Sequence, residues 1–356
     1  MGTMNIFQFT GRRTIKTGVA VFLTALICHL MNWSPMFAVV TAIVTIEPTA
    51  IDSIKKAFIR FPATAIGTAI AMLFTFWLGD SVFTYTFVAV LTIVTCYKLK
   101  LNDGMIVATL TGVLMIATVH QHYVSSFFVR LETTTTGLVV ASLVNVLLLP
   151  PKYSVMIASK IQQLFYESAD LLTKRSMELL CNQPFDKDIR QAFQTLSRRL
   201  EDVEKLCSYQ KKEWRFHRIA RKDIRAFHYE YKKLMILRQL LYHIGNVVYL
   251  PSHHLVLDHQ HMKFLTFIIQ QLKESLYSRS FSIQPDTYRQ ISELRQWFLE
   301  LEHMKCENAL AGEQRLVPET AILYEFLSIH HLIQDLHLLH HHEVRHQKVV
   351  TSHYQA

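Results

Sequence analysis

The chain has 356 residues, enough for two or three domains, and half of these residues are apolar. The formal net charge is +9, but no basic block is dense enough to indicate nucleic-acid binding. In a membrane protein such a balance is more simply explained by anionic lipid and by control of topology. The five cysteines are scattered without a CxxC pair, which favours reduced, structural thiols over a disulfide framework.

Charged residues are distributed unevenly along the chain. Nine of the 37 Lys and Arg residues precede Lys152, as do five of the 28 acidic residues. From Lys152 onward, charges recur every few residues. The composition therefore predicts an all-α membrane protein with two parts, a six-helix transmembrane domain over residues 1–151 and a cytoplasmic helical domain over residues 152–356.

Six apolar stretches in the first part are candidate membrane spans. A bilayer core requires about 20 apolar helical residues, and a helix satisfies its own backbone in lipid. The first stretch has no evident cleavage site, so it is interpreted as a retained helix and not as a signal peptide. The second contains a short apolar core followed by Glu47-Pro48, which predicts a break near one end or an interfacial helix end. The predicted spans are 14–32, 34–51, 60–79, 82–99, 104–122 and 127–149.

The orientation follows from the short loops. Lys and Arg residues precede the first span, follow the second, fourth and sixth, and are absent from the loops around "NWSP", "GDS" and "HQHYVSS". Because positive charge is retained on the cytoplasmic side, this alternation predicts a multi-pass plasma-membrane protein with both termini in the cytoplasm.

An internal repeat relates the two halves of the membrane part. Without gaps, residues 31–75 and 101–145 share 10 identities in 45 positions, and Arg60 falls on Arg130 as Gly67 falls on Gly137. The offset carries the first three spans onto the last three. An odd number of crossings separates the copies, so they have opposite orientation, which predicts a 3+3 inverted repeat of the kind found in secondary transporters.

The two arginines, Arg60 and Arg130, are expected at the starts of the third and sixth helices. One interpretation is that each extends to lipid headgroups from a helix end. The other is that they bind a substrate carboxylate, because guanidinium pairs bidentately with carboxylates and a helix N-terminus favours anions. Glu132 lies two residues after Arg130 and is a candidate to neutralise a neighbouring charge.

Carboxylates in the membrane part are candidates for proton coupling. Glu47 is the first choice because it closes a long uncharged run beside a proline, and Glu132 is the second. The alternative is that these carboxylates are simply solvated at span ends.

Glycines recur with other small residues at four-residue spacing, which favours close packing of membrane helices over a substrate path lined by glycine. The helix-packing glycines are Gly67, Gly104, Gly112 and Gly137.

The second part shows helical spacing of apolar residues throughout. The pattern predicts a first helix through Ile157 and Leu172, a break at "QPFD" and further helices near 186–210, 226–250, 258–279, 286–305 and 318–345. These would form an antiparallel helical bundle. No glycine-rich phosphate loop or nucleophile elbow is present, so neither an enzyme nor a cofactor is predicted.

Seven of the 19 histidines crowd the segment from His330 to His346. His337 and His341 have a spacing compatible with zinc, but no further ligand pattern supports a closed site. We therefore interpret the segment as a polar surface and predict no metal, with metal or pH sensing as the alternative.

The order of these motifs resembles the aromatic acid exporter family of the Gram-positive bacterial type, related to fusaric acid resistance proteins. The resemblance rests on Pro48, Arg60 and Gly67-Thr68, on "RLETTTTGLVVASLVNVLLLPP", and on the helical domain that follows. It implies efflux of small aromatic carboxylic acids, for which we expect the proton motive force as driving force. The alternative is a membrane-anchored signalling or scaffolding protein that acts through its helical domain. Association into homo-oligomers is expected in either case.

Overall fold

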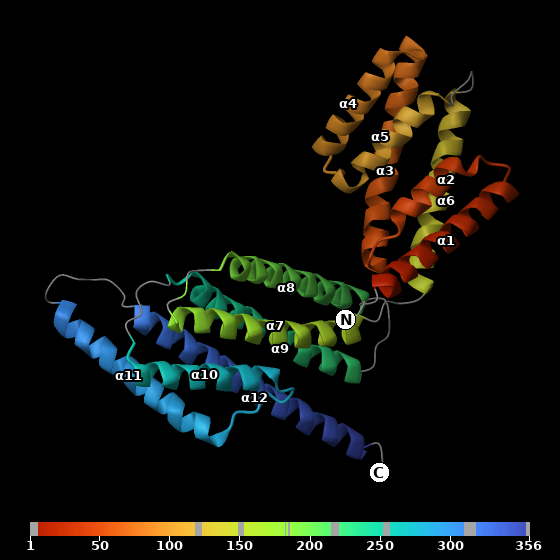
Figure 1. Ribbon diagram of the computed structural model, residues 1–356. Coiled ribbons are helices and arrows are strands. Elements are labelled where there is room, and N and C mark those ends of the chain that lie inside the picture. Colours follow the sequence, from red (N-terminus) through yellow and green to blue (C-terminus); the bar gives the residue numbers. More distant parts are fainter. Residues whose placement is uncertain are drawn as a thin grey trace. The chain divides into compact units, whose positions relative to one another are not determined.

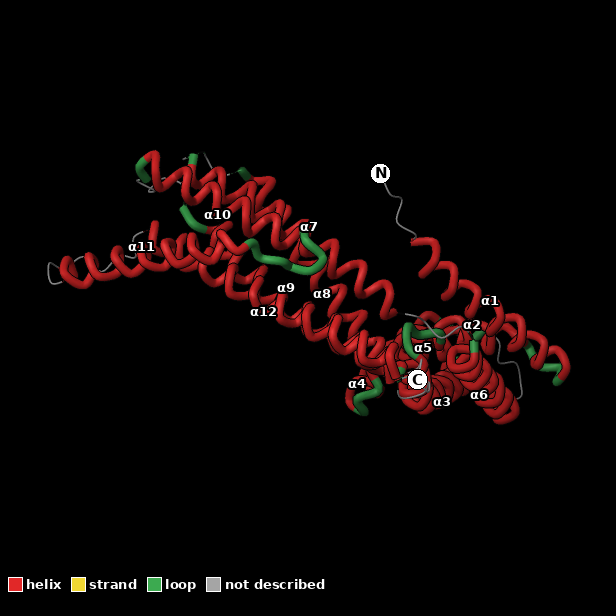
Figure 2. The backbone as a smooth tube through the Cα atoms, turned by 90° about the horizontal axis from the view of Figure 1, so that it is seen from below, coloured by secondary structure: helices red, strands yellow, loops and turns green. Residues whose placement is uncertain are grey.

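The structure is a computed structural model that describes residues 6–117, 123–148, 153–181, 183, 186–214, 221–251, 257–309 and 318–353. Over these residues it is all-α, as predicted, and Figure 2 shows only helices and loops there. The helices are α1 (Ile6–Leu30), α2 (Pro35–Thr45), α3 (Ala50–Leu78), α4 (Val82–Lys98), α5 (Asn102–Ile116), α6 (Tyr123–Leu147), α7 (Tyr153–Leu180), α8 (Lys187–Glu213), α9 (Arg221–Tyr249), α10 (His259–Tyr277), α11 (Pro285–Ala309) and α12 (Pro318–His353).

The chain divides into two compact units. The first contains Met1–Pro151 and Tyr209–Arg218, and the second contains Lys152–Ser208 and Ile219–Ala356. Within the first unit, Glu213 accepts a hydrogen bond from the backbone N–H of Ala50 at 2.7 Å. The last turn of α8 therefore belongs with the first unit, although it lies in the second half of the sequence.

The first unit is built from α1 to α6 (Figure 1). In its principal pairs, α1 packs on α2 and α6, α2 on α6, α3 on α4, α5 and α6, and α4 on α5. Exchanging α1, α2 and α3 with α4, α5 and α6 turns this set of pairs into itself. The two triplets therefore occupy equivalent packing positions, and the third helix of each packs mainly on the helices of the other.

Among the residues of this unit that the structure describes, three helices are long and apolar enough to cross a membrane, over Arg13–Leu30, Ala50–Leu78 and Val124–Leu147. Three shorter apolar helices accompany them, α2, α4 and α5. At 1.5 Å per residue, α2 is only about 16 Å long, roughly half the thickness of a bilayer core. The predicted second span 34–51 was therefore too long.

Local sequence explains the break between α2 and α3. Residues 46–49 are not helical, because Pro48 has no N–H to donate. The Thr49 side chain then accepts a hydrogen bond from the N–H of Asp52 and caps the new helix. Helix α3 runs from Ala50 through Arg60 and Pro62, so the prediction that Arg60 begins the third helix was wrong. The cap that starts this helix, Thr49, lies eleven residues before Arg60, and Asp52 supplies an acidic residue in the first turn.

The second unit contains the helices predicted after the "QPFD" break and before it. The ends of α8 to α11 lie within five residues of those expected, whereas α12 continues to His353, eight residues past its predicted end at 345. Its helices pack as α7 on α9 and α10, α12 on α9, α10 and α11, and α10 on α11. The predicted stripe of α7 is buried, with Ile157, Ile161 and Phe165 each at most 1% exposed. The apolar residues whose spacing predicted α7 therefore also form part of the core of this unit.

Candidate functional site

Arg60 lies in the interior of α3 and is buried, with 6% of its surface exposed. Its guanidinium donates to Glu47 Oε1 at 2.9 Å, to the Val44 carbonyl at 3.0 Å and to the Asp103 carbonyl at 3.3 Å. Lys56 Nζ lies 3.2 Å from the other oxygen of Glu47. A side chain held in this way ties α3 to the end of α2 and the start of α5, which disagrees with its interpretation as an anchor that reaches lipid headgroups.

The non-helical segment 46–49 is held by Asn145 of α6. Its amide nitrogen lies 3.0 Å from the Glu47 carbonyl and 2.6 Å from Ser53 Oγ. Its amide oxygen accepts from Lys16 Nζ at 2.9 Å. Asn145 is only 2% exposed, so water is excluded there as a partner. Its amide instead bonds the carbonyl groups that the break in the helix leaves without partners.

The sequence interpretation did not single out Lys16 or Asn145 for this role. Lys16 was counted only among the positive charges at the start of the first span. Asn145 carried a usable signal, because it is a single amide in the long apolar run "GLVVASLVNVLLLP". Which partner it would meet could not be read from that run, because the partners lie more than 90 residues away.

Arg130 lies in α6, eight residues into the helix, and is 5% exposed. Like Arg60, it does not begin its helix as predicted. No ion pair of Arg130 occurs among the described residues, and its buried Nε and Nη1 have no hydrogen-bond partner there. The guanidinium carbon lies 3.2 Å from the ring centroid of Phe37, a cation–π arrangement. One turn later, the hydroxyl of Thr134 is also buried without a partner in this part of the structure.

The two equivalent arginines are therefore in unequal electrostatic surroundings. At the 70-residue offset, the position of Glu47 corresponds to Ala117, which is the C-cap of α5. Arg60 has a carboxylate supplied by the chain, whereas the equivalent sequence position of the second half is an exposed alanine. Burial of a guanidinium without an anion is costly, which makes Arg130 the unusual member of the pair.

Glu132 does not compensate for Arg130. Its side chain is exposed, and no ion pair joins it to Arg130 over the residues described. Residues two apart on a helix point to different sides, which explains the separation. The structure thus brings Glu47 to Arg60 and leaves Glu132 apart from Arg130.

The four predicted glycines all lie where helices cross closely. A Cβ built on Gly67 would be 2.5 Å from the carbonyl oxygen of Ala108, and one on Gly137 would collide with the carbonyl oxygen of Ala38. These two contacts are equivalent under the 70-residue offset. A Cβ on Gly104 would be 2.6 Å from the Cβ of Ala63, and one on Gly112 would be 2.9 Å from the carbonyl oxygen of Gly67. Close backbone contacts of this kind need small residues at the crossing.

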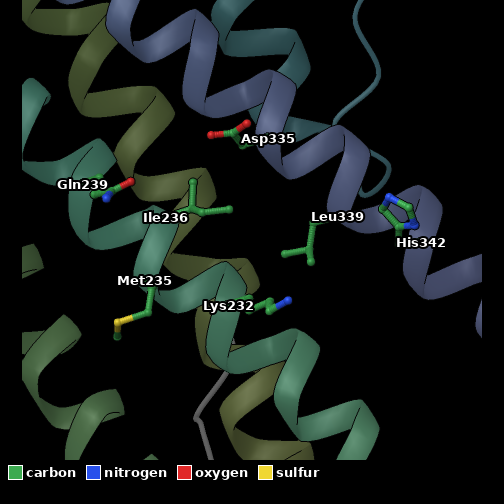
Figure 3. A pocket seen from close by; sticks show the side chains of 7 residues that line it. All are labelled: Lys232, Met235, Ile236, Gln239, Asp335, Leu339 and His342. Carbon is green, nitrogen blue, oxygen red and sulfur yellow. The ribbon is translucent and has the colours of Figure 1, made fainter.

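In the second unit, an open groove of about 390 Å³ runs between α9 and α12 (Figure 3). Ile236 and Leu339 give it an apolar floor, and Lys232, Asp335 and His342 supply charge and polarity at its edge. Mixed side chains in a shallow groove do not define the chemistry of a ligand. The remaining lining residues are Met235 and Gln239.

The histidine-rich segment lies in α12. The rings of His337 and His341 are 4.6 Å apart, edge to face. Across the described part of the chain, no group of three or more His, Cys, Asp or Glu side chains could hold a metal ion. Burial lowers the pKa of His330 to about 4, with smaller contributions from His331 and Arg295.

Comparisons with known proteins identify the relatives of this chain. Residues 8–148 match the family described as "Aromatic acid exporter family member 1". A UPF0421 protein of Bacillus cereus is 38% identical over 340 residues, which cover 94% of this chain and 95% of that protein. A UPF0421 protein of Oceanobacillus iheyensis is 39% identical over 343 residues, covering 93% and 96%. One from Staphylococcus haemolyticus is 45% identical over 252 residues, covering 70% and 76%. The chain, with its candidate membrane helices, therefore belongs to the aromatic acid exporter family, together with relatives named UPF0421 proteins.

Proposed function

We propose that this protein exports small aromatic carboxylic acids across the plasma membrane and is driven by the proton motive force. The observation that carries the proposal is the buried guanidinium of Arg130 in an apolar helical unit that belongs to an exporter family. A positive charge without a protein anion fits an anionic substrate. The proposal assigns the protein to transport and not to catalysis.

The transmembrane arrangement that we propose is six crossings in two inverted triplets, with both termini and the second unit, an antiparallel helical bundle, in the cytoplasm. The exchange of packing partners between α1–α3 and α4–α6 supports the repeat. The short helix α2 and the break after it also fit, because discontinuous helices are common at the binding sites of transporters with inverted repeats.

For proton coupling we propose Glu47 first and Glu132 second. Glu47 balances Arg60 and Lys56, so its protonation would remove the ion pairs that hold the ends of α2 and α3 together. A proton could in this way shift the population of two conformations, provided that it binds one of them better. Glu132 has no such partner over the described residues, and its role would depend on its surroundings in the membrane.

Transport into liposomes tests the proposal. Purified protein is reconstituted, a pH gradient is imposed, and entry of radiolabelled 4-hydroxybenzoate is followed. We expect entry that is faster than in empty liposomes, that a protonophore abolishes, and that Glu47→Gln uncouples from the gradient. Rates equal to those of empty liposomes at every gradient would contradict export.

The alternative is a scaffold that acts through its helical domain, and the groove between α9 and α12 is the surface it would use. Substitution of Leu339 by Arg separates the two functions. A scaffold would lose its partners, whereas an exporter would retain its transport rate in liposomes.

A further inference from the structure

From the two unequal halves of the repeat, we infer that the substrate carboxylate binds Arg130, in the place that Glu47 occupies beside Arg60. This inference rests on the proposed function and narrows it to one site and one class of ligand, an aromatic monocarboxylate. The two arginines, which the repeat makes equivalent, then have different roles. Arg60 is structural, and Arg130 binds the ligand.

The number of unpaired charges sets the charge of the ligand. Among the buried cations of the first unit that the structure describes, Lys16 is bonded to Asn145 and Arg60 to Glu47. Arg130 alone of these three has buried N–H groups without a partner. One guanidinium balances one carboxylate. A phosphate group, which carries about −1.5 to −2 charges, would need further cations.

The surroundings of Arg130 set the shape of the ligand. Phe37 covers one face of the guanidinium, so a carboxylate must approach in the plane of the N–H groups. The unpartnered hydroxyl of Thr134 is one helical turn away on the same side of α6, where it can meet the ligand. Phe37 is half-buried and offers an aromatic surface to a ring attached to that carboxylate.

Binding to the full-length purified protein, with radiolabelled 4-hydroxybenzoate as the probe, tests the inference. Arg130→Gln should weaken binding roughly 10- to 150-fold, because it removes a charge-assisted hydrogen-bonded pair. Phe37→Leu should weaken binding about three- to tenfold. The neutral analogue 4-hydroxybenzamide and inorganic phosphate should not compete with the probe. Competition by either at the concentration of the probe would contradict a site for monocarboxylates.

Two matched substitutions separate binding from architecture. Thr134→Val should weaken binding, whereas Thr135→Val, at the next and exposed position of α6, should leave it unchanged. Ala117→Glu supplies the second half with the carboxylate that the first half has. It should prevent binding of the probe and raise the thermal stability of the ligand-free protein. Retained affinity in a folded Ala117→Glu variant would overturn the inference.

Stability distinguishes the two arginines. Arg60→Gln should lower the midpoint of thermal unfolding, whereas Arg130→Gln should leave it unchanged or raise it, because an unpaired buried charge is removed. Equal losses of stability would mean that both arginines are structural. Bound probe should also raise the midpoint of thermal unfolding of the protein with Arg130 but not of Arg130→Gln. If phosphatidylglycerol raised the midpoint in this way and the probe did not, the site would bind lipid and the inference would fail.

The failure of this site and the failure of export give different results. Gradient-driven transport that persists in Arg130→Gln with unchanged affinity would refute the site and leave export standing. Binding that Arg130→Gln abolishes, in a protein that moves no substrate under any gradient, would support the site and refute export.

Discussion

The ion pair between Arg60 and Glu47 offers a direct test of how the first unit is held together. The two side chains are 7% and 14% exposed, and their closest atoms are 2.9 Å apart. Breaking a buried pair by removing one partner costs about 3–5 kcal/mol, because the other charge remains buried. The loss of unfolding free energy in Glu47→Gln should lie at or below the lower end of that range, since Lys56, the second partner of Glu47, is only partly buried. Arg60→Gln should cost more, because it also removes the hydrogen bonds to the carbonyl groups of Val44 and Asp103.

The double variant Arg60→Gln with Glu47→Gln separates the contribution of the ion pair from that of the other bonds of the two side chains. Its loss of stability should be smaller than the sum of the two single losses by about 1–3 kcal/mol. Lys56→Gln is the matched control, since a partly exposed ion pair contributes about 0–1 kcal/mol. The measurement is unfolding of the full-length protein in detergent, followed by size-exclusion chromatography after heating. Additive losses in the double variant, or a loss for Glu47→Gln no larger than that for Lys56→Gln, would refute the reasoning.

Three further predictions follow from other parts of the chain. Gly67→Ala and Gly137→Ala should each destabilise the protein by about 1–3 kcal/mol through overpacking at a helix crossing; Gly18→Ala, where an added Cβ meets nothing within 4 Å, should be neutral or slightly stabilising, and equal effects in unfolding experiments would contradict the packing. In a cysteine-free background, cysteines at Ser34 and Ser125 should react with an impermeant maleimide from outside, and one at Lys55 should not. Lys55 is chosen because it is exposed, whereas Ser53 in the same region is buried and unsuitable for labelling. The opposite labelling pattern would reverse the topology. Because the pKa of His330 is lowered to about 4 in the folded protein, the unfolded chain binds a proton at a higher pH than the folded chain does. The free energy of unfolding should therefore fall as the pH drops from about 6.5 toward 4, by about 2 kcal/mol at pH 5. His330→Gln should flatten this part of the unfolding profile, and an unchanged slope would exclude His330 as its cause.

The helices of the second half could be predicted from the sequence because their signals are local. Apolar residues recur with helical spacing, and "QPFD" marks a break, so α8 to α11 lie close to the expected ranges and α12 begins where expected. The start of α3 could not be predicted in the same way. Arg60 was the visible charge, but the cap is Thr49, whose bond to Asp52 is one weak signal among many threonines in the membrane part.

The candidate site was predictable only in its parts. Arg60 and Arg130 were recognised from the repeat, and Glu47 from its place beside Pro48. The pairing of Glu47 with Arg60, and the absence of a counterpart beside Arg130 in the described residues, depend on where the end of α2 lies against α3. Phe37 carried no signal, because one aromatic residue in an apolar segment resembles any other.

The exchange of packing partners has a consequence for biosynthesis. Helix α3 packs on α5 and α6, and the break at 46–49 depends on Asn145 for its hydrogen bonds. Neither partner exists while the first three helices leave the ribosome. A nascent chain that ends near residue 100 therefore lacks the Asn145 amide that bonds the Glu47 carbonyl and Ser53, and it should remain open to membrane quality control. Only when α6 has been inserted can either triplet close its core, so the two halves must mature together, and neither should be stable when expressed alone.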